Sequence, residues 1–157
     1  MTAVSSYLVG LVGTGVTQSL SPAVHMAEGA AQGLAYVFRP VDLTALELDP
    51  GRLPEILDWC ERLGYDAVTI THPCKQAVIA HLDRVDPVAA ALGAVNTVLL
   101  TPEGRVGHNT DTTGFEAAFR ADMPDAPRGA VVQLGAGGAG TAVADALVRL
   151  GVERLTI

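Results

Sequence analysis

The sequence is poor in lysine, in cysteine, in aromatic residues and in positive charge. Its 157 residues include 10 basic and 17 acidic side chains, which gives a formal net charge of −7 at pH 7. The absence of a basic stripe argues against nucleic acid as a partner. No stretch approaches the roughly 18 apolar residues that cross a bilayer, and no signal-peptide pattern opens the chain. We therefore expect neither a nucleic-acid partner nor a membrane.

Cysteine is limited to Cys60 and Cys74, and the two do not form a Cys-x-x-Cys pair. Two such thiols are typical of a reducing cytoplasm rather than of a disulfide scaffold, so a cytoplasmic protein without a metal site is expected. Cys60 is predicted to lie on a helix, in the core. Cys74 adjoins Lys75, so it is either a packed thiol, which is favoured, or a reactive one.

Strand-like and helix-like segments alternate along the chain. Strands are expected over 7–12, 35–41, 67–71, 94–100, 106–108, 131–134 and 154–157, and helices over 22–33, 54–63, 73–82, 86–92, 111–121 and 138–150, with Ser21 capping the first helix. This alternation predicts an α/β fold, in which an open mixed or parallel sheet is followed by the start of a Rossmann domain.

Prolines and a glycine over 123–129 predict a domain boundary, which divides the chain into 1–122 and 123–157. The second part ends where a second strand begins. Since a lone βαβ unit has too little surface to pack against, we expect the sequence to be a piece of a longer protein.

A glycine-rich turn lies between the last predicted strand–helix pair. Residues 135–140 read Gly-Ala-Gly-Gly-Ala-Gly, which fits G-x-G-x-x-G directly after a strand and at the start of a helix. In that context the first glycine makes the tight turn, the second lets backbone approach a pyrophosphate, and the third lets the helix pack closely. The motif predicts dinucleotide binding, although a glycine turn with only a packing role would look alike. The position that chooses between NAD and NADP falls at or beyond Ile157.

The single lysine is Lys75, whereas the other nine basic residues are arginine. Arginine cannot release its proton near neutral pH, but a lysine ammonium can when burial destabilises the charge. Lys75 is therefore either a solvated surface residue or a proton-transfer group. Asp111 is either a first-turn helix acid or the partner that holds this ammonium.

Five motifs occur in one order: Ser-Leu-Ser-Pro from Ser19, Thr-His-Pro-Cys-Lys from Thr71, Gly-Ala-Val-Asn-Thr around Asn96, Asn-Thr-Asp ending at Asp111, and the glycine turn from Gly135. Together they resemble the shikimate dehydrogenase family over nearly the whole chain. The Thr-His-Pro-Cys-Lys-Gln and Gly-His-Asn-Thr-Asp stretches look like its quinate/shikimate dehydrogenase branch.

The resemblance implies a role for each matching residue. Lys75 is the implied acid/base group, with Asp111 as its catalytic partner. The implied substrate contacts are Ser19 and Ser21 to a carboxylate, and Thr71, Lys75, Asn96 and Asp111 to the ring hydroxyl groups. The implied cofactor diphosphate contacts are Gly135, Ala136, Gly137, Gly138 and Ala139. One departure is Thr69, which stands where the family usually has Asn.

The expected function is therefore NAD- or NADP-dependent hydride transfer between shikimate and 3-dehydroshikimate, and also between quinate and 3-dehydroquinate, in a monomer or homodimer. Shikimate is favoured, since a Thr in place of Ser21 would suit the extra hydroxyl of quinate better. A non-catalytic relative that binds a cyclic hydroxy acid, or nothing, is the alternative. A lysine-dependent dehydrogenase of folates or amino acids explains fewer motifs, and no phosphoryl-transfer loop is present.

Overall fold

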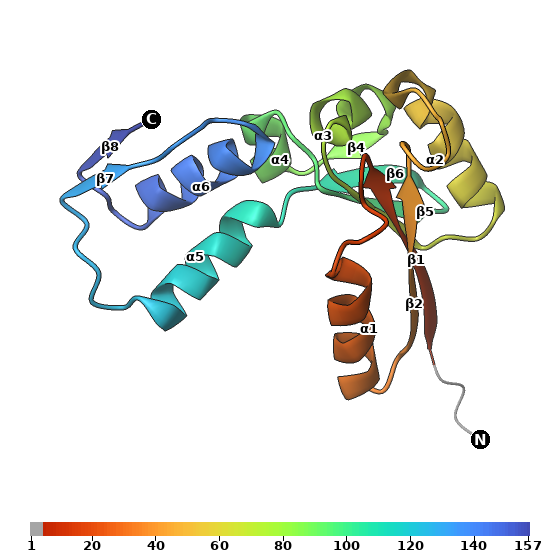
Figure 1. Ribbon diagram of the computed structural model, residues 1–157, viewed down its shortest axis with the longest axis horizontal. Coiled ribbons are helices and arrows are strands. Elements are labelled where there is room, and N and C mark those ends of the chain that lie inside the picture. Colours follow the sequence, from red (N-terminus) through yellow and green to blue (C-terminus); the bar gives the residue numbers. More distant parts are fainter. Residues whose placement is uncertain (1–4) are drawn as a thin grey trace.

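The computed structural model describes residues 5–157, and in it the protein folds into two parts that are connected between His108 and Asp111 (Figure 1). One part is built on a six-stranded sheet, and the other holds a parallel pair of strands. In Figure 1 the six-stranded sheet lies with α1, α2 and α3, and the strand pair lies with α6 and α5. The expected α/β class is confirmed.

The six-stranded sheet is mixed and has the order β2-β1-β3-β5-β6-β4. Its strands are β1 (Ser6–Gly13), β2 (Ala35–Asp42), β3 (Ala67–Ile70), β4 (Arg84–Val85), β5 (Thr97–Thr101) and β6 (Gly104–His108). β1 runs parallel to both β2 and β3, while β5 is antiparallel to β3 and to β6. This order places the ends of β1, β2 and β3 side by side.

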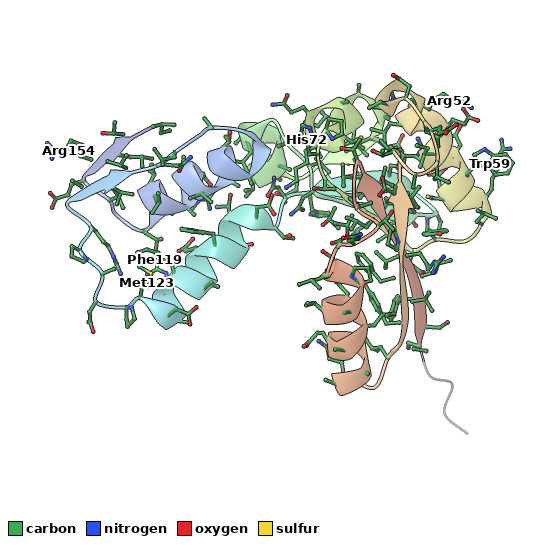
Figure 2. The ribbon with its side chains drawn as sticks, viewed as in Figure 1. Arg52, Trp59, His72, Phe119, Met123 and Arg154 are labelled. Atoms are coloured by element: carbon green, nitrogen blue, oxygen red, sulfur yellow. The ribbon has the colours of Figure 1, made fainter. Side chains whose placement is uncertain are left out.

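Helices cover both faces of this sheet. α2 (Leu53–Arg62) buries Leu53, Ile56, Leu57 and Cys60 in a core with Val12, Val68, Ile70 and Val98 from the strands. The short helices α3 (Cys74–Ala77) and α4 (Pro87–Leu92) add Cys74 and Ala89 to the same core. Val9, Leu11, Val16 and Phe38 form a second cluster, and α1 (Ser21–Ala31) packs on β2. Trp59 points away from the core and is half exposed (Figure 2).

The second part contains β7 (Ala130–Val132), α6 (Gly138–Arg149) and β8 (Arg154–Thr156). β7 and β8 are parallel, so α6 is the crossover of a βαβ unit. α5 (Asp111–Asp122) packs against α6, and the Thr112 hydroxyl donates to the Ala142 carbonyl at 3.3 Å. Phe119 and Met123 lie at the far end of α5 (Figure 2). The boundary at residue 123 stays a prediction.

Two predicted helices differ in the structure. The helix predicted over 73–82 is only α3, followed by a 3₁₀ helix, η2 (Val78–His81). The Lys75 carbonyl accepts from the Val95 N–H at 2.8 Å, an acceptor that an uninterrupted α-helix would offer to residue 79. Ser21 is not the predicted cap, because it lies inside α1 and the start of that helix has no side-chain cap.

The strand predicted over 94–100 also starts later, because Ala94 and Val95 donate their N–H groups to the carbonyls of Ala89 in α4 and Lys75 in α3. The 3₁₀ helix η1 (Pro50–Arg52) and β4 were not predicted. The remaining elements lie within one or two residues of their predicted bounds. Among residues 5–157 no helix is both long and apolar enough to cross a membrane.

Candidate active site

Lys75 sits in the first turn of α3, directly after the connection from β3. Its backbone is fixed by the carbonyl bond to Val95, and Cys74 N–H donates to the Thr71 carbonyl at 2.8 Å. The Cys74 side chain packs in the core and is only 1% exposed, which holds this turn against the sheet. Cys74 thus belongs to the core, whereas Lys75 lines a cleft.

The Lys75 ammonium meets the Asp111 carboxylate. Lys75 Nζ lies 2.5 Å from Asp111 Oδ2, and the two side chains are 17% and 29% exposed. Asp111 Oδ1 accepts a second bond from the Asn96 amide nitrogen at 2.8 Å, and that nitrogen also donates to Thr110 Oγ1 at 2.9 Å. Both oxygens of Asp111 are thus bound, so the carboxylate is held in one orientation toward the lysine.

Asn96 and Asn109 connect this pair to the sheet. The Asn96 side-chain oxygen accepts from the Thr110 N–H at 3.1 Å, and Asn109 Oδ1 accepts from the Asp111 N–H at 2.9 Å. Asn109 also donates its amide to the Ala94 carbonyl at 2.9 Å. Both asparagines are nearly fully buried, so their polar groups need these partners, and the start of α5 is fixed by them.

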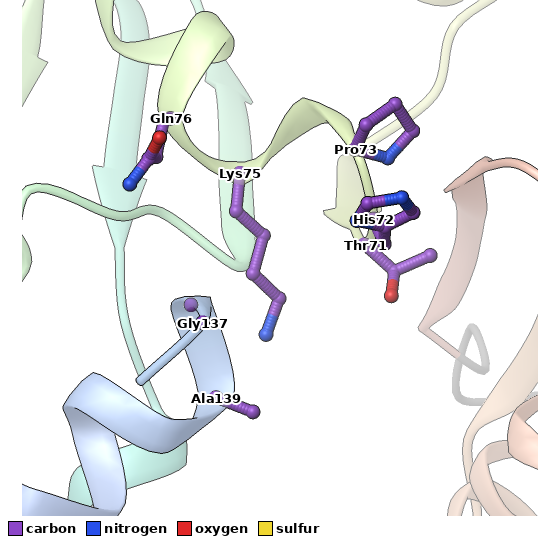
Figure 3. A pocket seen from close by; sticks show the side chains of 8 residues that line it. Thr71, His72, Pro73, Lys75, Gln76, Gly137 and Ala139 are labelled. Atoms are coloured by element: carbon purple, nitrogen blue, oxygen red, sulfur yellow. The ribbon is translucent and has the colours of Figure 1, made fainter. Parts of the chain in front are cut away.

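A cleft of about 360 Å³ opens beside Lys75. One wall carries Thr71, His72, Pro73, Lys75 and Gln76, and the other carries Gly137, Gly138 and Ala139. Figure 3 shows the lysine extending between these walls toward the start of α6. The stem of Lys75 reaches the glycine turn itself, because a Cβ added to Gly138 would lie 3.4 Å from Lys75 Cδ.

The glycine turn has the geometry that a diphosphate needs. Gly135 has a φ of +98°, which favours glycine, and a Cβ added to Gly140 would lie 2.6 Å from the Gly135 carbonyl oxygen. Nothing lies within 4 Å of a Cβ added to Gly137, so the space beside that backbone is open. The turn opens α6, whose first N–H groups and dipole suit an anion. These residues therefore fit a dinucleotide cofactor.

Ser19 lies in a different cavity from the lysine. Ser19 lines a hollow of about 590 Å³ together with Thr17 and Asp42, between α1 and β2. The Ser19 hydroxyl donates to Ser21 Oγ at 3.1 Å, and the Ser21 N–H donates to Ser19 Oγ at 3.2 Å. The loop that carries them is joined to the Lys75 region, because the Thr14 N–H donates to the His72 carbonyl at 3.0 Å.

Residues 11–98 match the family described as the shikimate dehydrogenase substrate binding domain. The chain belongs to the shikimate dehydrogenase family. Three relatives show how similar the chain is to members of this family, two by sequence and one by structure.

"Shikimate dehydrogenase (NADP(+))" of Streptomyces avermitilis is 53% identical over 97% of the chain and 52% of its own length. "Quinate/shikimate dehydrogenase (NAD(+))" of Corynebacterium efficiens is 50% identical over 97% of the chain and 54% of its own length. The solved structure titled quinate dehydrogenase from Corynebacterium glutamicum in complex with NAD superposes with a TM-score of 0.87 at 47% identity, covering 96% of the chain and 54% of that structure. The chain spans about half the length of the curated relatives it matches.

The structure brings most residues of the shikimate dehydrogenase motifs together, in two groups. Lys75, Asp111 and Asn96 form one bonded network, and Thr71 shares the cleft with Lys75 and with Gly137, Gly138 and Ala139. Ser19 and Ser21 form the second group, and Gly135 and Ala136 directly precede the cleft residues Gly137, Gly138 and Ala139 in the chain. The roles of these residues stay predictions.

Sequence reasoning missed the contributions of His72 and Gln76 to the cleft and of Asn109 to the network. All three lie inside or next to the quoted motifs, so their position in those motifs could have indicated that they belong to the site. Cys74 is the packed thiol that was favoured: it is buried, and burial raises the pKa of its thiol, which keeps it protonated and unreactive. Cys60 is buried on α2, as predicted. Within residues 5–157, no three His, Cys, Asp or Glu side chains converge as a metal site requires.

Proposed function

We propose that the chain binds shikimate and takes part in the NAD(P)-dependent interconversion of shikimate and 3-dehydroshikimate, with quinate and 3-dehydroquinate as a second pair. The observation that carries the proposal is the Lys75–Asp111 pair in a cleft whose opposite wall is the glycine turn. In this proposal residues 1–122 hold the substrate, and residues 123–157 begin the cofactor domain. The family to which the chain belongs is one of oxidoreductases.

Lys75 is the proposed proton carrier. In its neutral form the amine accepts the proton of the substrate hydroxyl as a hydride leaves the same ring carbon, and in its charged form it returns that proton when the ketone is reduced. Asp111 Oδ2 accepts from Lys75 Nζ and Oδ1 accepts from Asn96, so the proposed role of Asp111 is to hold the lysine in place rather than to move a proton. Each oxygen has a second lone pair, with which the carboxylate can also accept from a ring hydroxyl. Their partial burial limits water access to the pair.

The remaining substrate contacts are assigned by position. Ser19 and Ser21 present two hydroxyls at the start of α1, which suits a carboxylate. Thr71 and Asn96 flank the lysine and are assigned to ring hydroxyls. Ser21 suits either acid, and we favour shikimate because no larger hydroxyl side chain stands there for the additional hydroxyl of quinate.

The turn from Gly135 to Ala139 is the proposed binding place for the cofactor diphosphate, for NADP or for NAD. The nicotinamide cofactor, when bound, supplies or takes up the hydride. Since Gly138 and Lys75 line the same cleft, the diphosphate turn and the proton carrier are adjacent in space. Two buried, unpaired cysteines suit the cytoplasm as the place of this reaction, and a monomer or homodimer is proposed.

Calorimetric titration of shikimate and of quinate into the folded chain tests the proposed substrate class. We expect binding of at least one acid, with strong loss in Ser19→Ala and in Lys75→Ala and no change in Gln32→Ala, an exposed control at the end of α1. Absence of binding by the folded chain would contradict the proposal.

The alternative is a relative that binds a ring carboxylate without redox activity, and the observation in its favour is Thr69 in the position where the family usually has Asn. Turnover separates the two functions. Binding without hydride transfer, in this chain and in a chain of the relatives' full length, supports the alternative, whereas turnover that requires Lys75 supports the enzyme.

A further inference from the structure

The loop between β1 and α1, which carries Ser19, is held by a carboxylate that lies 25 residues further along the chain. Asp42, the last residue of β2, accepts from the Gly15 N–H at 2.9 Å and from the Thr44 N–H at 3.0 Å through Oδ1. Its Oδ2 accepts from the Thr17 N–H at 2.8 Å and from the Thr17 hydroxyl at 2.6 Å. Two oxygens thus receive four hydrogen bonds.

These four bonds use the full accepting capacity of the carboxylate. Asp42 is 6% exposed, and none of the ion pairs among residues 5–157 includes it. The hydroxyl of Thr17 is the main cause that lowers the pKa of Asp42 to about 2, with the backbone N–H groups of Thr17, Gly15 and Thr44 adding to it and burial opposing it. At neutral pH Asp42 is therefore a charged group whose partners all belong to the protein.

The bonds to Asp42 fix the path of the loop toward the two serines. Gly15 has a φ of +66°, so the chain turns sharply there, and the Ser19 N–H then donates to the Val16 carbonyl at 3.0 Å. Ser19 and Ser21 are bonded to each other directly after this turn. At its other end the loop is tied to the His72 carbonyl through Thr14, so its position is defined against both β2 and the Lys75 region.

Without Asp42 the N–H groups of Gly15, Thr17 and Thr44 would need water as a partner. The loop would also lose all three bonds that Gly15 and Thr17 donate to this residue of β2. The orientation of the Ser19 and Ser21 hydroxyls depends on this loop because their own bonds are only to each other and to neighbouring backbone. A hydroxyl pair that is free to move binds a carboxylate less tightly, since its ordering opposes binding.

We propose that Asp42 is a positioning residue for the substrate carboxylate: it holds the 14–18 loop so that Ser19 and Ser21 face the ligand, without touching the ligand itself. This inference rests on the proposed function, in which the two serines bind that carboxylate. It assigns a role in substrate affinity to a residue of β2, which lies outside the Ser-Leu-Ser-Pro motif.

The test is the affinity of shikimate for variants of the chain, measured by calorimetry. In Asp42→Asn one carboxylate oxygen becomes an NH₂ group that faces N–H or O–H donors, so we expect the dissociation constant to rise about tenfold. Thr17→Ala removes only the hydroxyl bond and is expected to weaken binding about threefold, while Thr17→Ser, which keeps the hydroxyl, restores it. Circular dichroism and thermal melting establish that each variant is folded.

Asp86→Asn is the matched control. Asp86 also accepts two backbone N–H bonds, from Val88 and Ala89 at the start of α4, but it lies on another loop. We expect this variant to bind shikimate as the unsubstituted chain does. Equal weakening in Asp42→Asn and Asp86→Asn would show a general loss of stability and would overturn the inference.

A double-mutant cycle separates positioning from a merely structural role. When Ser19→Ala and Ser21→Ala are present, Asp42→Asn should cause no further loss of affinity, because the groups it positions are gone. A tenfold loss that persists in that background, or unchanged affinity in folded Asp42→Asn, would refute the inference while leaving the substrate assignment intact. If the unsubstituted chain binds neither shikimate nor quinate, the proposed function itself is wrong and the inference falls with it.

Discussion

Replacing Lys75 by arginine separates charge from proton transfer. In the unsubstituted protein Lys75 Nζ lies 2.5 Å from Asp111 Oδ2. Arginine keeps the positive charge and, through its planar guanidinium group, a hydrogen bond to Asp111. It cannot give up its proton at neutral pH, so the proposed acid/base step is lost while the electrostatic environment of the cleft is retained.

Lys75→Arg should have a small effect on stability and a large effect on turnover. Because the Lys75 and Asp111 side chains are 17% and 29% exposed, solvent screens the pair, and its exchange for an Arg–Asp pair should change the free energy of unfolding by less than about 1 kcal/mol. That corresponds to a melting shift of at most about 3 °C. Loss of general acid–base catalysis lowers turnover about 100- to 10,000-fold, or about 3–5 kcal/mol in the barrier.

The assay follows the oxidation of shikimate through the absorbance of the reduced cofactor, in this chain and in a chain of the relatives' full length. Gln76→Ala is the control, since Gln76 lines the same cleft and has no part in the proposed proton transfer. We expect Lys75→Arg to melt normally, to bind shikimate within a few-fold of the unsubstituted protein and to be nearly inactive. Turnover within tenfold of the unsubstituted protein would refute Lys75 as the proton carrier.

Three further predictions concern stability and the glycine turn. Hydrogen bonds lower the pKa of Asp42 from 3.8 to about 2, so between these pH values the unfolded chain takes up the proton before the folded chain does. The contribution of Asp42 to stability is therefore complete above about pH 4 and is lost as the pH falls toward 2. Melting temperatures measured across this range should fall less steeply in Asp42→Asn. Leu57→Ala, at a fully buried site, should lower the free energy of unfolding by about 2–5 kcal/mol in urea titrations, whereas Trp59→Ala on the same helix, half exposed, should cost less than half as much. Gly140→Ala places a methyl group 2.6 Å from a backbone oxygen and should abolish NADP and NAD binding measured by fluorescence, while Gly114→Ala, with open space around it, should leave binding unchanged.

The order of elements and the identity of the chemical groups were readable from the sequence, because both depend on local signals. The glycine pattern over 135–140 predicted the turn and the start of α6, and a helix predicted over 86–92 is found as α4, Pro87–Leu92. Lys75 could be singled out because it is the one lysine of the chain. These features depend on backbone preferences within a few residues.

Element ends were predicted less well where a distant group decides them. The long helix expected after Pro73 is interrupted because the Lys75 carbonyl bonds to Val95, 20 residues further along the chain, and β5 begins late for a related reason. Such bonds replace the local ones on which helix and strand periodicity depends. No periodic pattern in the sequence could have indicated them.

By itself the sequence determined which chemical groups are present and where a glycine-rich turn precedes a helix. The tertiary structure alone decided which groups meet: β3 lies beside β5, so Lys75 faces Asp111 across 36 residues of chain and Asn96 can orient the carboxylate. It also placed Asp42, which no motif marks, under the loop of Ser19. The physical reason is that side-chain hydrogen bonds over such separations depend on strand order and register, which arise from burying the whole core rather than from any local preference.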